Sequence, residues 1–196
     1  MANSSEEASD PSPKTDALLE ALLRAAPTAA SGKITRRQAA GPAPLSFAQQ
    51  RLWFLDQVVP GNPAYNVLRA FGLTGQLDTA VLEKSLAEIV RCHESLRTTF
   101  TAVEGRPVQM VQPVPGPGHS QRQLMPLLSR VIDLRRLPEP EQGGKIHDLM
   151  TKESRRTFDL TRGPLMRMTL LRLGEEEHVL LLVMHHIVSD LSLIHI

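Results

Sequence analysis

Cysteine and aromatic residues are scarce in this sequence. Cys92 is the only cysteine among 196 residues, which excludes an internal disulfide framework and a zinc site built from several thiolates. We expect its side chain to be a packed thiol rather than a nucleophile. The chain also has a single tryptophan, Trp53, which we expect in the core rather than on a binding surface.

An excess of charge of one sign and a long hydrophobic run are also missing. The formal net charge is +1, so no electrostatic feature argues for a nucleic-acid partner. No apolar run approaches the ~20 residues that span a bilayer. The polar N-terminus MANSSEEASDPSPK has no apolar segment of a signal peptide. We therefore expect a cytoplasmic location and no membrane partner.

What the sequence does contain divides into a polar leader and a globular part. Residues 1–43 are rich in small, polar and proline residues, which predicts a disordered leader with a short helix and a linker. From Pro44 onward, apolar residues recur at helix and strand periods, which predicts an α/β or α+β fold. Helices are predicted over 46–59, 78–94 and 141–156, with Ser46 and Asp78 as N-caps of the first two. Strands are predicted over 66–75, 95–103, 106–113, 131–136, 164–173 and 177–186, and the second and third are expected to form a hairpin around Glu104-Gly105.

The stretch VLLLVMHHIVSD, residues 179–190, ends an apolar strand in His185, His186 and Asp190. Successive side chains of a strand point to opposite faces, so we expect one imidazole to face a cavity and the other to pack inside. That separation disfavours a metal site, whose ligands must converge on one ion, and we expect no metal. A neutral imidazole at a cavity suits general base catalysis. Two purely structural histidines are the alternative.

A second candidate lies in the alternating segment LRTTF, whose pattern would let Arg97 point inward. The alternative, from this segment alone, is an ordinary surface arginine. A buried carboxylate needs a partner, so Asp190 would either orient an imidazole or pair with a buried arginine. The sequence contains no phosphate-binding loop, nucleophile elbow or CxxC motif. Catalysis through a serine or cysteine nucleophile therefore has no support.

Three stretches together resemble the condensation domains of nonribosomal peptide synthetases. SFAQQRLWFL, residues 46–55, matches the family's first core motif at its defining positions. RCHESLRTTF, residues 91–100, is similar to the second motif, with Cys92 where the family usually has arginine. MHHIVSD, residues 184–190, is similar to the third, HHxxxDG. The likeness covers residues 44–190, and three motifs in this order make it specific.

The resemblance implies a fold like that of chloramphenicol acetyltransferase, with a tunnel between two lobes. This chain would supply the N-terminal lobe, an incomplete α/β (α+β) two-layer sandwich. The implied reaction is amide formation between a donor acyl or peptidyl thioester and an acceptor aminoacyl thioester. Both arrive on the phosphopantetheine arms of carrier proteins, and no cofactor is expected to be bound directly. An adenylation domain is an expected neighbour, and residues 1–43 would be able to dock an upstream synthetase subunit.

The resemblance also assigns roles to individual residues. His186 would be the catalytic histidine, facing the tunnel near the attacking nitrogen, while His185 packs away from it. Asp190 would be structural, in an ion pair with Arg97. Leu191 stands where the family has glycine, and we expect residues 191–196 to be an artefactual tail. A complete condensation domain is considerably longer than the matching stretch, so we expect the chain to be inactive by itself.

Two other functions remain open. One is a freestanding acyltransferase of the same fold that uses acyl-coenzyme A, which the absence of downstream adenylation and carrier domains would favour. The other is a non-catalytic module of the same fold that recruits a tailoring enzyme. The presence of His185, His186 and Asp190 argues against that second alternative, because a pure docking surface needs none of them.

Overall fold

The computed structural model describes residues 41–114 and 128–189, and leaves out the side chains of residues 128 and 129. The leader predicted over residues 1–43 therefore lies almost entirely outside the described residues. So do Asp190 and the tail predicted over residues 191–196. The predicted domain boundaries accordingly stay predictions.

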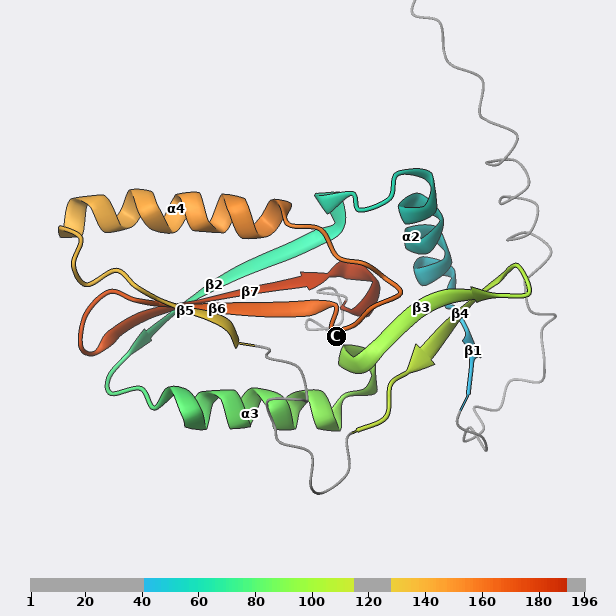
Figure 1. Cartoon of the computed structure of the whole chain (residues 1–196), viewed down its shortest axis with the longest axis horizontal. Coiled ribbons are helices and arrows are strands. Elements are labelled where there is room, and N and C mark those ends of the chain that lie inside the picture. Colours follow the sequence, from blue (N-terminus) through green and yellow to red (C-terminus); the bar gives the residue numbers. More distant parts are fainter. Residues whose placement is uncertain (1–40, 115–127, 190–196) are drawn as a thin grey trace, which may run out of the picture.

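Three α-helices and seven strands make up most of the described residues (Figure 1). They are β1 (Ala43–Pro44), α2 (Phe47–Val58), β2 (Asn66–Thr74), α3 (Thr79–Cys92), β3 (Thr98–Val103), β4 (Arg106–Val111), β5 (Leu128–Asp133), α4 (Glu139–Arg155), β6 (Met166–Arg172) and β7 (Glu177–His185). Short 3₁₀ turns lie at η1 (Pro63–Tyr65), η2 (Glu94–Arg97) and η4 (His186–Val188).

These strands form two sheets. The larger has the order β2-β7-β6-β5, in which only the β5–β6 pair is parallel. The smaller is antiparallel, with the order β1-β4-β3. Its β3–β4 hairpin turns at Glu104 and Gly105, which both have positive φ, 51° and 75°. Two consecutive residues of that kind match the right-handed twist of the paired strands, and the predicted hairpin is confirmed.

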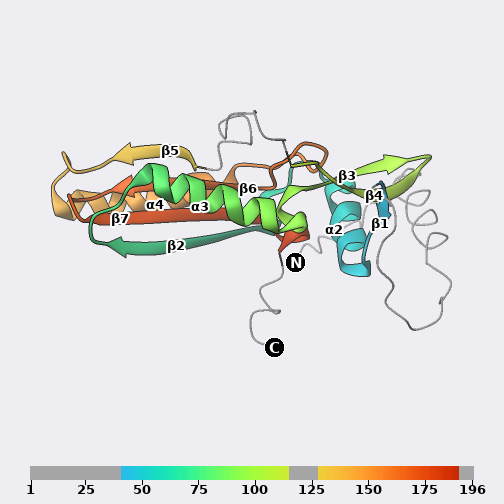
Figure 2. The ribbon, with the colours of Figure 1, turned by 90° about the horizontal axis from the view of Figure 1, so that it is seen from below.

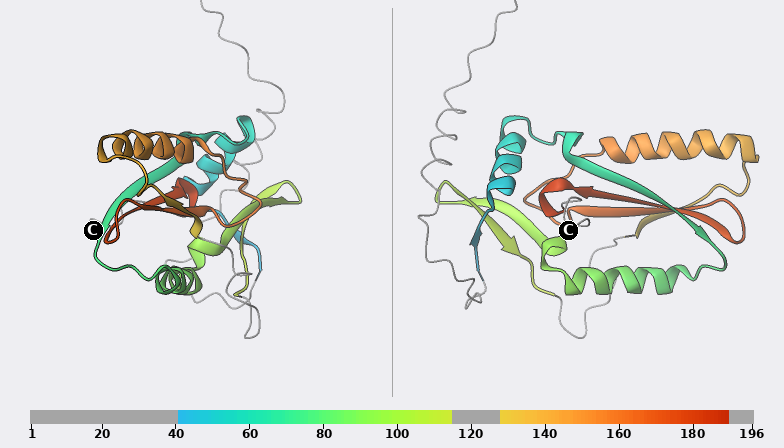
Figure 3. Two further views of the ribbon diagram at one scale, coloured as in Figure 1. Left: turned by 60° about the vertical axis from the view of Figure 1, so that its left-hand side comes forward. Right: turned by 180° about the vertical axis from the view of Figure 1, so that it is seen from behind.

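The larger sheet is covered by a helix on each face (Figure 3). Leu170 and Leu180 belong to an apolar cluster with α3, and Leu171 and Leu181 to a second cluster with α4. Figure 2 shows α3 running along the sheet between the edge strands β2 and β5. The mixed α/β class is confirmed. Around this sheet the elements lie as helix, sheet and helix, because β6 and β7 are apolar on both faces and need cover on both.

The start of α2 is fixed by a capping box. The Gln49 backbone N–H donates to Ser46 Oγ (3.2 Å), and the Ser46 backbone N–H donates to Gln49 Oε1 (2.9 Å). This reciprocal pair satisfies two backbone donors that a helix N-terminus leaves open. Trp53 on the same helix is 5% exposed and lies in the core, as predicted. It packs in a third apolar cluster, with Leu45, Phe100, Leu160, Leu165, Ile187 and Val188.

Two local predictions were wrong. Strand β7 ends at His185 rather than His186, because η4 begins at His186 and buries Ile187 and Val188. Cys92 is exposed rather than packed, and its sulfur lies 3.5 Å from Glu88 Oε1. The buried stripe of α3 ends at Val90, and a residue two positions later falls on a different side of a helix.

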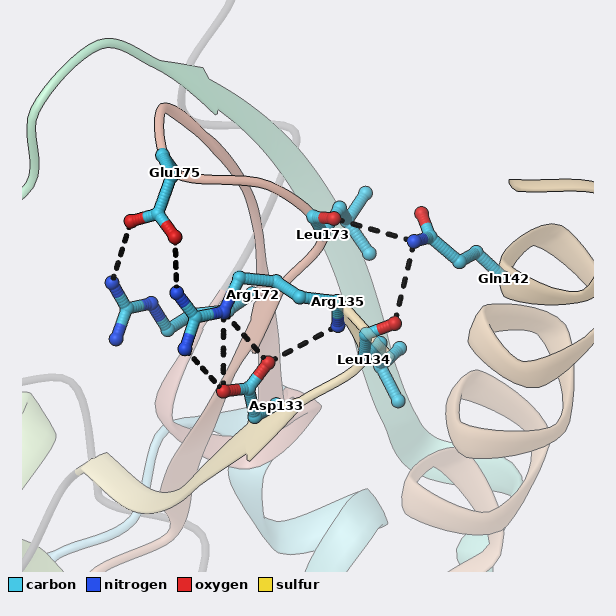
Figure 4. Close-up of polar contacts among 7 residues, drawn as sticks. All are labelled: Asp133, Leu134, Arg135, Gln142, Arg172, Leu173 and Glu175. Carbon is cyan, nitrogen blue, oxygen red and sulfur yellow. Dashed lines mark hydrogen bonds and ion pairs between the residues drawn. The ribbon is translucent and has the colours of Figure 1, made fainter. Parts of the chain in front are cut away.

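Polar contacts connect the end of β5, the β6–β7 turn and the start of α4, at the end of the larger sheet that lies farthest from His185 (Figure 4). Arg135 bonds to Asp133 (2.7 Å) and to Glu175 (2.5 Å), and the first contact holds the pKa of the Asp133 carboxyl well below its usual range. Gln142 of α4 donates to the carbonyls of Leu134 (3.3 Å) and Leu173 (3.2 Å). The charged groups are solvated, and exposed ion pairs of this kind stabilise a fold little.

Within residues 41–114 and 128–189, no helix has the length and apolar character needed to cross a membrane.

Candidate active site

The chain leaves the larger sheet at His185 and turns sharply through η4. His185 N–H still bonds to the carbonyl of Leu165 (3.0 Å), so the strand is held up to its last residue. Ile187 and Val188 then enter the apolar cluster around Trp53 and are 3% and 9% exposed. Because these two side chains turn inward, the His186 ring is directed outward, and His186 is exposed.

An open cavity of about 330 Å³ lies in front of His186. Its walls come from four places in the sequence: the start of α2, the region of η2 and β3, strand β4, and η4. Polar groups are few and lie among apolar ones, which is the usual composition of a ligand site. The lining residues are Ser46, Ala48, Gln49, Leu52, Ser95, Thr98, Phe100, Gln109, His186, Ile187, Val188 and Ser189.

The His186 ring has a fixed tautomer. Its Nδ1 lies 2.6 Å from the carbonyl oxygen of Ser189. A carbonyl oxygen only accepts hydrogen bonds, so Nδ1 carries the proton in this contact. In the neutral ring the lone pair then lies on Nε2, which is the nitrogen able to accept a proton from a substrate.

His185 has the opposite environment. It is 3% exposed, and its Nδ1 accepts a hydrogen bond from the backbone N–H of Ile187 (3.1 Å). The rings of Tyr65 and Phe158 lie 6.4 Å and 6.2 Å from its own. Burial, and secondarily the neighbouring His186, lower the pKa of His185 to about 4. His185 is therefore neutral near pH 7, and its hydrogen bond with Ile187 stabilises the turn that contains His186.

Arg97 points inward but does not line the cavity. Its Nη1 donates to the carbonyl of Gln112 (2.7 Å), and its Nη2 lies 3.5 Å from Glu94 Oε1. Its Nε is buried and has no acceptor among the described residues. The predicted partner, Asp190, lies outside the described residues, so the ion pair between them stays a prediction.

Sequence reasoning gave no site role to Gln49, which the structure places against η4. Its Nε2 donates to the carbonyl of Ile187 (3.4 Å), and its backbone lies in the capping box of α2. The N-cap signal of Ser46 indicated the helix start and did not involve Gln49. It carried no signal that the same glutamine reaches a turn 138 residues away in sequence. Across the described part of the chain, no group of histidine, cysteine and carboxylate side chains is placed to hold a metal ion.

Comparison with known proteins identifies the family. The model of the condensation domain matches residues 39–194. The chain is 49% identical over 150 residues to a linear gramicidin synthase of Brevibacillus parabrevis. It is 43% identical over 183 residues to phosphinothricin tripeptide synthetase PhsC of Streptomyces viridochromogenes. These alignments cover 76% and 91% of this chain, and 2% and 16% of those proteins.

Solved structures agree. The first condensation domain of the CDA synthetase superposes with a TM-score of 0.66 and 28% identity, covering 76% of this chain and 36% of that one. The starter condensation domain of rhizomide synthetase RzmA has a TM-score of 0.63, at 24% identity, with 76% and 33% of the two chains covered. The chain belongs to the condensation-domain family of nonribosomal peptide synthetases. It spans about a third of the solved domains that it matches.

Proposed function

We propose that this chain forms the N-terminal part of a condensation domain that joins two carrier-bound substrates by an amide bond. The donor is an acyl or peptidyl thioester and the acceptor an aminoacyl thioester, each on the phosphopantetheine arm of a carrier protein. Membership of the family supports this reaction class. One observation supports the assignment of the site: an exposed His186 whose Nε2 bears the ring's lone pair at a cavity.

In the proposed reaction the acceptor amine attacks the thioester carbonyl carbon. The new C–N bond forms as the C–S bond breaks, and the electron pair of that bond leaves on sulfur. His186 Nε2 takes the proton that the nitrogen loses and passes it to the departing thiolate. Both atoms and charge therefore balance without a further reactant.

His186 would contribute in two ways. Proton transfer by a positioned base typically accelerates a reaction by roughly 10²–10⁴-fold. Holding an amine and a carbonyl in reactive geometry can lower a barrier by about 7–11 kcal/mol. Because a thioester is already activated, we infer that positioning of the amine is the larger of the two contributions.

The supporting residues have separate roles in this proposal. His185 stabilises η4 by accepting a hydrogen bond from the Ile187 N–H. Asp190 and Arg97 form the structural ion pair, for which the buried Nε of Arg97 offers a donor. The partners are donor and acceptor carrier proteins and an adjacent adenylation domain, with residues 1–43 available for an upstream subunit. By itself the chain would not turn over, because the second lobe is needed to close the tunnel.

The decisive experiment replaces His186 in the complete condensation domain that carries this sequence. Donor and acceptor carriers are loaded, and amide formation is followed in single turnover by mass spectrometry. His186→Ala should slow amide formation by at least about 100-fold. His186→Gln, which keeps a hydrogen-bonding group but accepts no proton, should retain more activity than His186→Ala if positioning dominates.

A matched control is His147→Ala, since His147 is an exposed histidine on α4 that does not line the cavity. It should react at the wild-type rate. An unchanged rate for His186→Ala would refute both roles assigned to His186. A wild-type domain that acylates free amines from acyl-coenzyme A, and ignores loaded carriers, would favour the freestanding acyltransferase instead.

A further inference from the structure

Gln49 connects the first helix of the domain to the turn that carries His186. Its side-chain oxygen accepts the Ser46 N–H (2.9 Å), and its side-chain nitrogen donates to the carbonyl of Ile187 (3.4 Å). One amide group therefore caps α2 and reaches η4 at the same time. Both its oxygen and its nitrogen are used, which fixes the orientation of the amide.

Ile187 is held at both of its backbone polar groups by side chains. Its N–H donates to His185 Nδ1 (3.1 Å), and its carbonyl accepts from Gln49 Nε2. The two side chains come from β7 and α2, which lie far apart in sequence. The Ile187 side chain is itself 3% exposed. A single 3₁₀ turn has few hydrogen bonds of its own, here the one from the Ser189 N–H to the His186 carbonyl (3.3 Å). The contacts of Ile187 with His185 and Gln49 therefore help to fix the geometry of the turn.

The position of the His186 ring depends on that geometry. The ring is exposed, and its Nδ1 is held by the Ser189 carbonyl (2.6 Å) across the same turn. A rotation of the peptide between Ile187 and Val188 would move the Ser189 carbonyl and release Nδ1. The ring could then adopt the other tautomer and lose the lone pair on Nε2.

We infer that Gln49 is a positioning residue for His186: through the Ile187 carbonyl it holds the turn in the conformation that keeps the proton on Nδ1 and the lone pair on Nε2 of this cavity-lining ring. This role rests on the proposed amide-forming function. It assigns a task in the reaction to a residue that had no predicted role of its own beyond its place in the first motif.

The neighbouring Gln50 provides a matched control. It lies on the same helix, and its Nε2 donates to the carbonyl of Leu45 (3.1 Å) rather than to η4. Gln50 does not line the cavity. Three variants of the complete domain are compared: Gln49→Met, Gln49→Glu and Gln50→Met. Gln49→Glu keeps an acceptor for the Ser46 N–H and hence the capping box, but cannot donate to Ile187.

Two measurements separate positioning from folding. Amide formation is measured at a pH well above the range in which ordinary imidazoles titrate. Under that condition the negative charge introduced by Gln49→Glu does not lower the rate simply by favouring a protonated imidazole. We expect both Gln49 variants to lower kcat by about three- to tenfold, the cost of one hydrogen bond, with KM for the loaded carriers unchanged. Nitrogen-15 NMR of His186 should show a smaller population of the Nδ1–H tautomer in both, and Gln50→Met should match the wild type.

A Gln49→Glu variant with wild-type kcat and tautomer would overturn the inference and leave Gln49 with the cap alone. So would a Gln50→Met variant that loses as much activity as Gln49→Met. Should Gln49→Met fail to fold, Gln49→Glu and Gln50→Met still decide the question. The tautomer is measured without substrate, so a wild-type domain that forms no amide refutes the proposed function and leaves the Gln49 contact testable.

Discussion

The Nδ1 atoms of His185 and His186 have opposite hydrogen-bonding roles, although the residues are adjacent. Nδ1 of His185 accepts from the Ile187 N–H at 3.1 Å, whereas Nδ1 of His186 donates to the Ser189 carbonyl at 2.6 Å. One ring therefore carries its proton on Nε2 and the other on Nδ1. One side chain is buried and the other lines the cavity.

This relationship predicts two different tautomers in one dipeptide. Nitrogen-15 spectra of the histidine-labelled protein at about pH 8, where free imidazole is neutral, should show His185 as the Nε2–H form and His186 as the Nδ1–H form. Signals are assigned with His185→Asn and His186→Asn. Two rings of the same tautomer would contradict the prediction.

His185 should make the fold sensitive to acid. Its pKa is about 4 in the folded state, against 6.5 for an ordinary histidine, mainly because the ring is buried. Between these two pH values the His185 ring is protonated in the unfolded chain but neutral in the folded protein. The free energy of unfolding is therefore at its full value above about pH 6.5 and decreases as the pH falls toward 4. The shift corresponds to about 3 kcal/mol. Melting temperatures measured across that pH interval provide the test.

The control is His185→Asn, whose side-chain oxygen replaces the Nδ1 acceptor but does not titrate. The variant loses ring packing at every pH, so the comparison concerns the slope and not the absolute stability. We expect the wild type to lose more stability than the variant between pH 6.5 and pH 4. Parallel curves would show that His185 does not titrate as the structure implies.

Much of the fold could be predicted from the sequence, because local residue patterns mark where its helices and strands begin. Ser46, Asp78 and the Glu104-Gly105 pair indicated two helix starts and a hairpin, and each lies where predicted. The strand end at His185 was missed because it depends on tertiary packing. Ile187 and Val188 fit the apolar pattern of a longer strand, but the core around Trp53 accepts them only in a turn.

The candidate site was predictable in kind and less so in detail. The paired histidines indicated one buried and one cavity-facing ring, and the structure has that arrangement at His185 and His186. The reason differs, since a 3₁₀ turn rather than strand alternation separates the rings. The link from Gln49 to Ile187 could not be read from the sequence, because a contact between residues so far apart follows only from the packing of α2 on η4.

Asp56 is expected to destabilise the protein at neutral pH. Its pKa is raised, chiefly by burial and also by the charge of Asp159, while the Gly61 N–H opposes this as a hydrogen-bond donor at 3.4 Å. A carboxyl whose pKa is raised in the folded state costs stability as the pH rises above its unfolded pKa, and the cost is complete once the pH exceeds the folded pKa. Asp56→Asn removes the charge and keeps an acceptor for Gly61. It should raise the melting temperature at pH 7.

The benefit of Asp56→Asn should shrink as the pH is lowered, because the wild-type carboxyl then gains its proton. Asp148→Asn, at an exposed position on α4, is the matched control and should change the melting temperature little at either pH. A lower melting temperature for Asp56→Asn at pH 7 would show that the ionised carboxylate is needed.

The last prediction concerns Glu153 and Arg167, which form a buried ion pair at 3.1 Å between α4 and β6. Their side chains are 7% and 9% exposed, and Arg167 also lies 4.0 Å from the centre of the Phe158 ring, which in turn packs on His185. Glu153→Ala would leave the Arg167 charge buried without its carboxylate, and such losses cost about 3–5 kcal/mol. Arg135→Ala, which breaks the solvated pairs with Asp133 and Glu175, should lower the melting temperature far less.

The Glu153→Ala substitution should also affect the histidine pair, because Arg167 lies over the Phe158 ring and that ring packs on His185. Glu153→Ala should therefore broaden the His185 ring signals at temperatures where the protein remains folded. Equal melting temperatures for the two variants would mean that the buried pair is no more important than the exposed one.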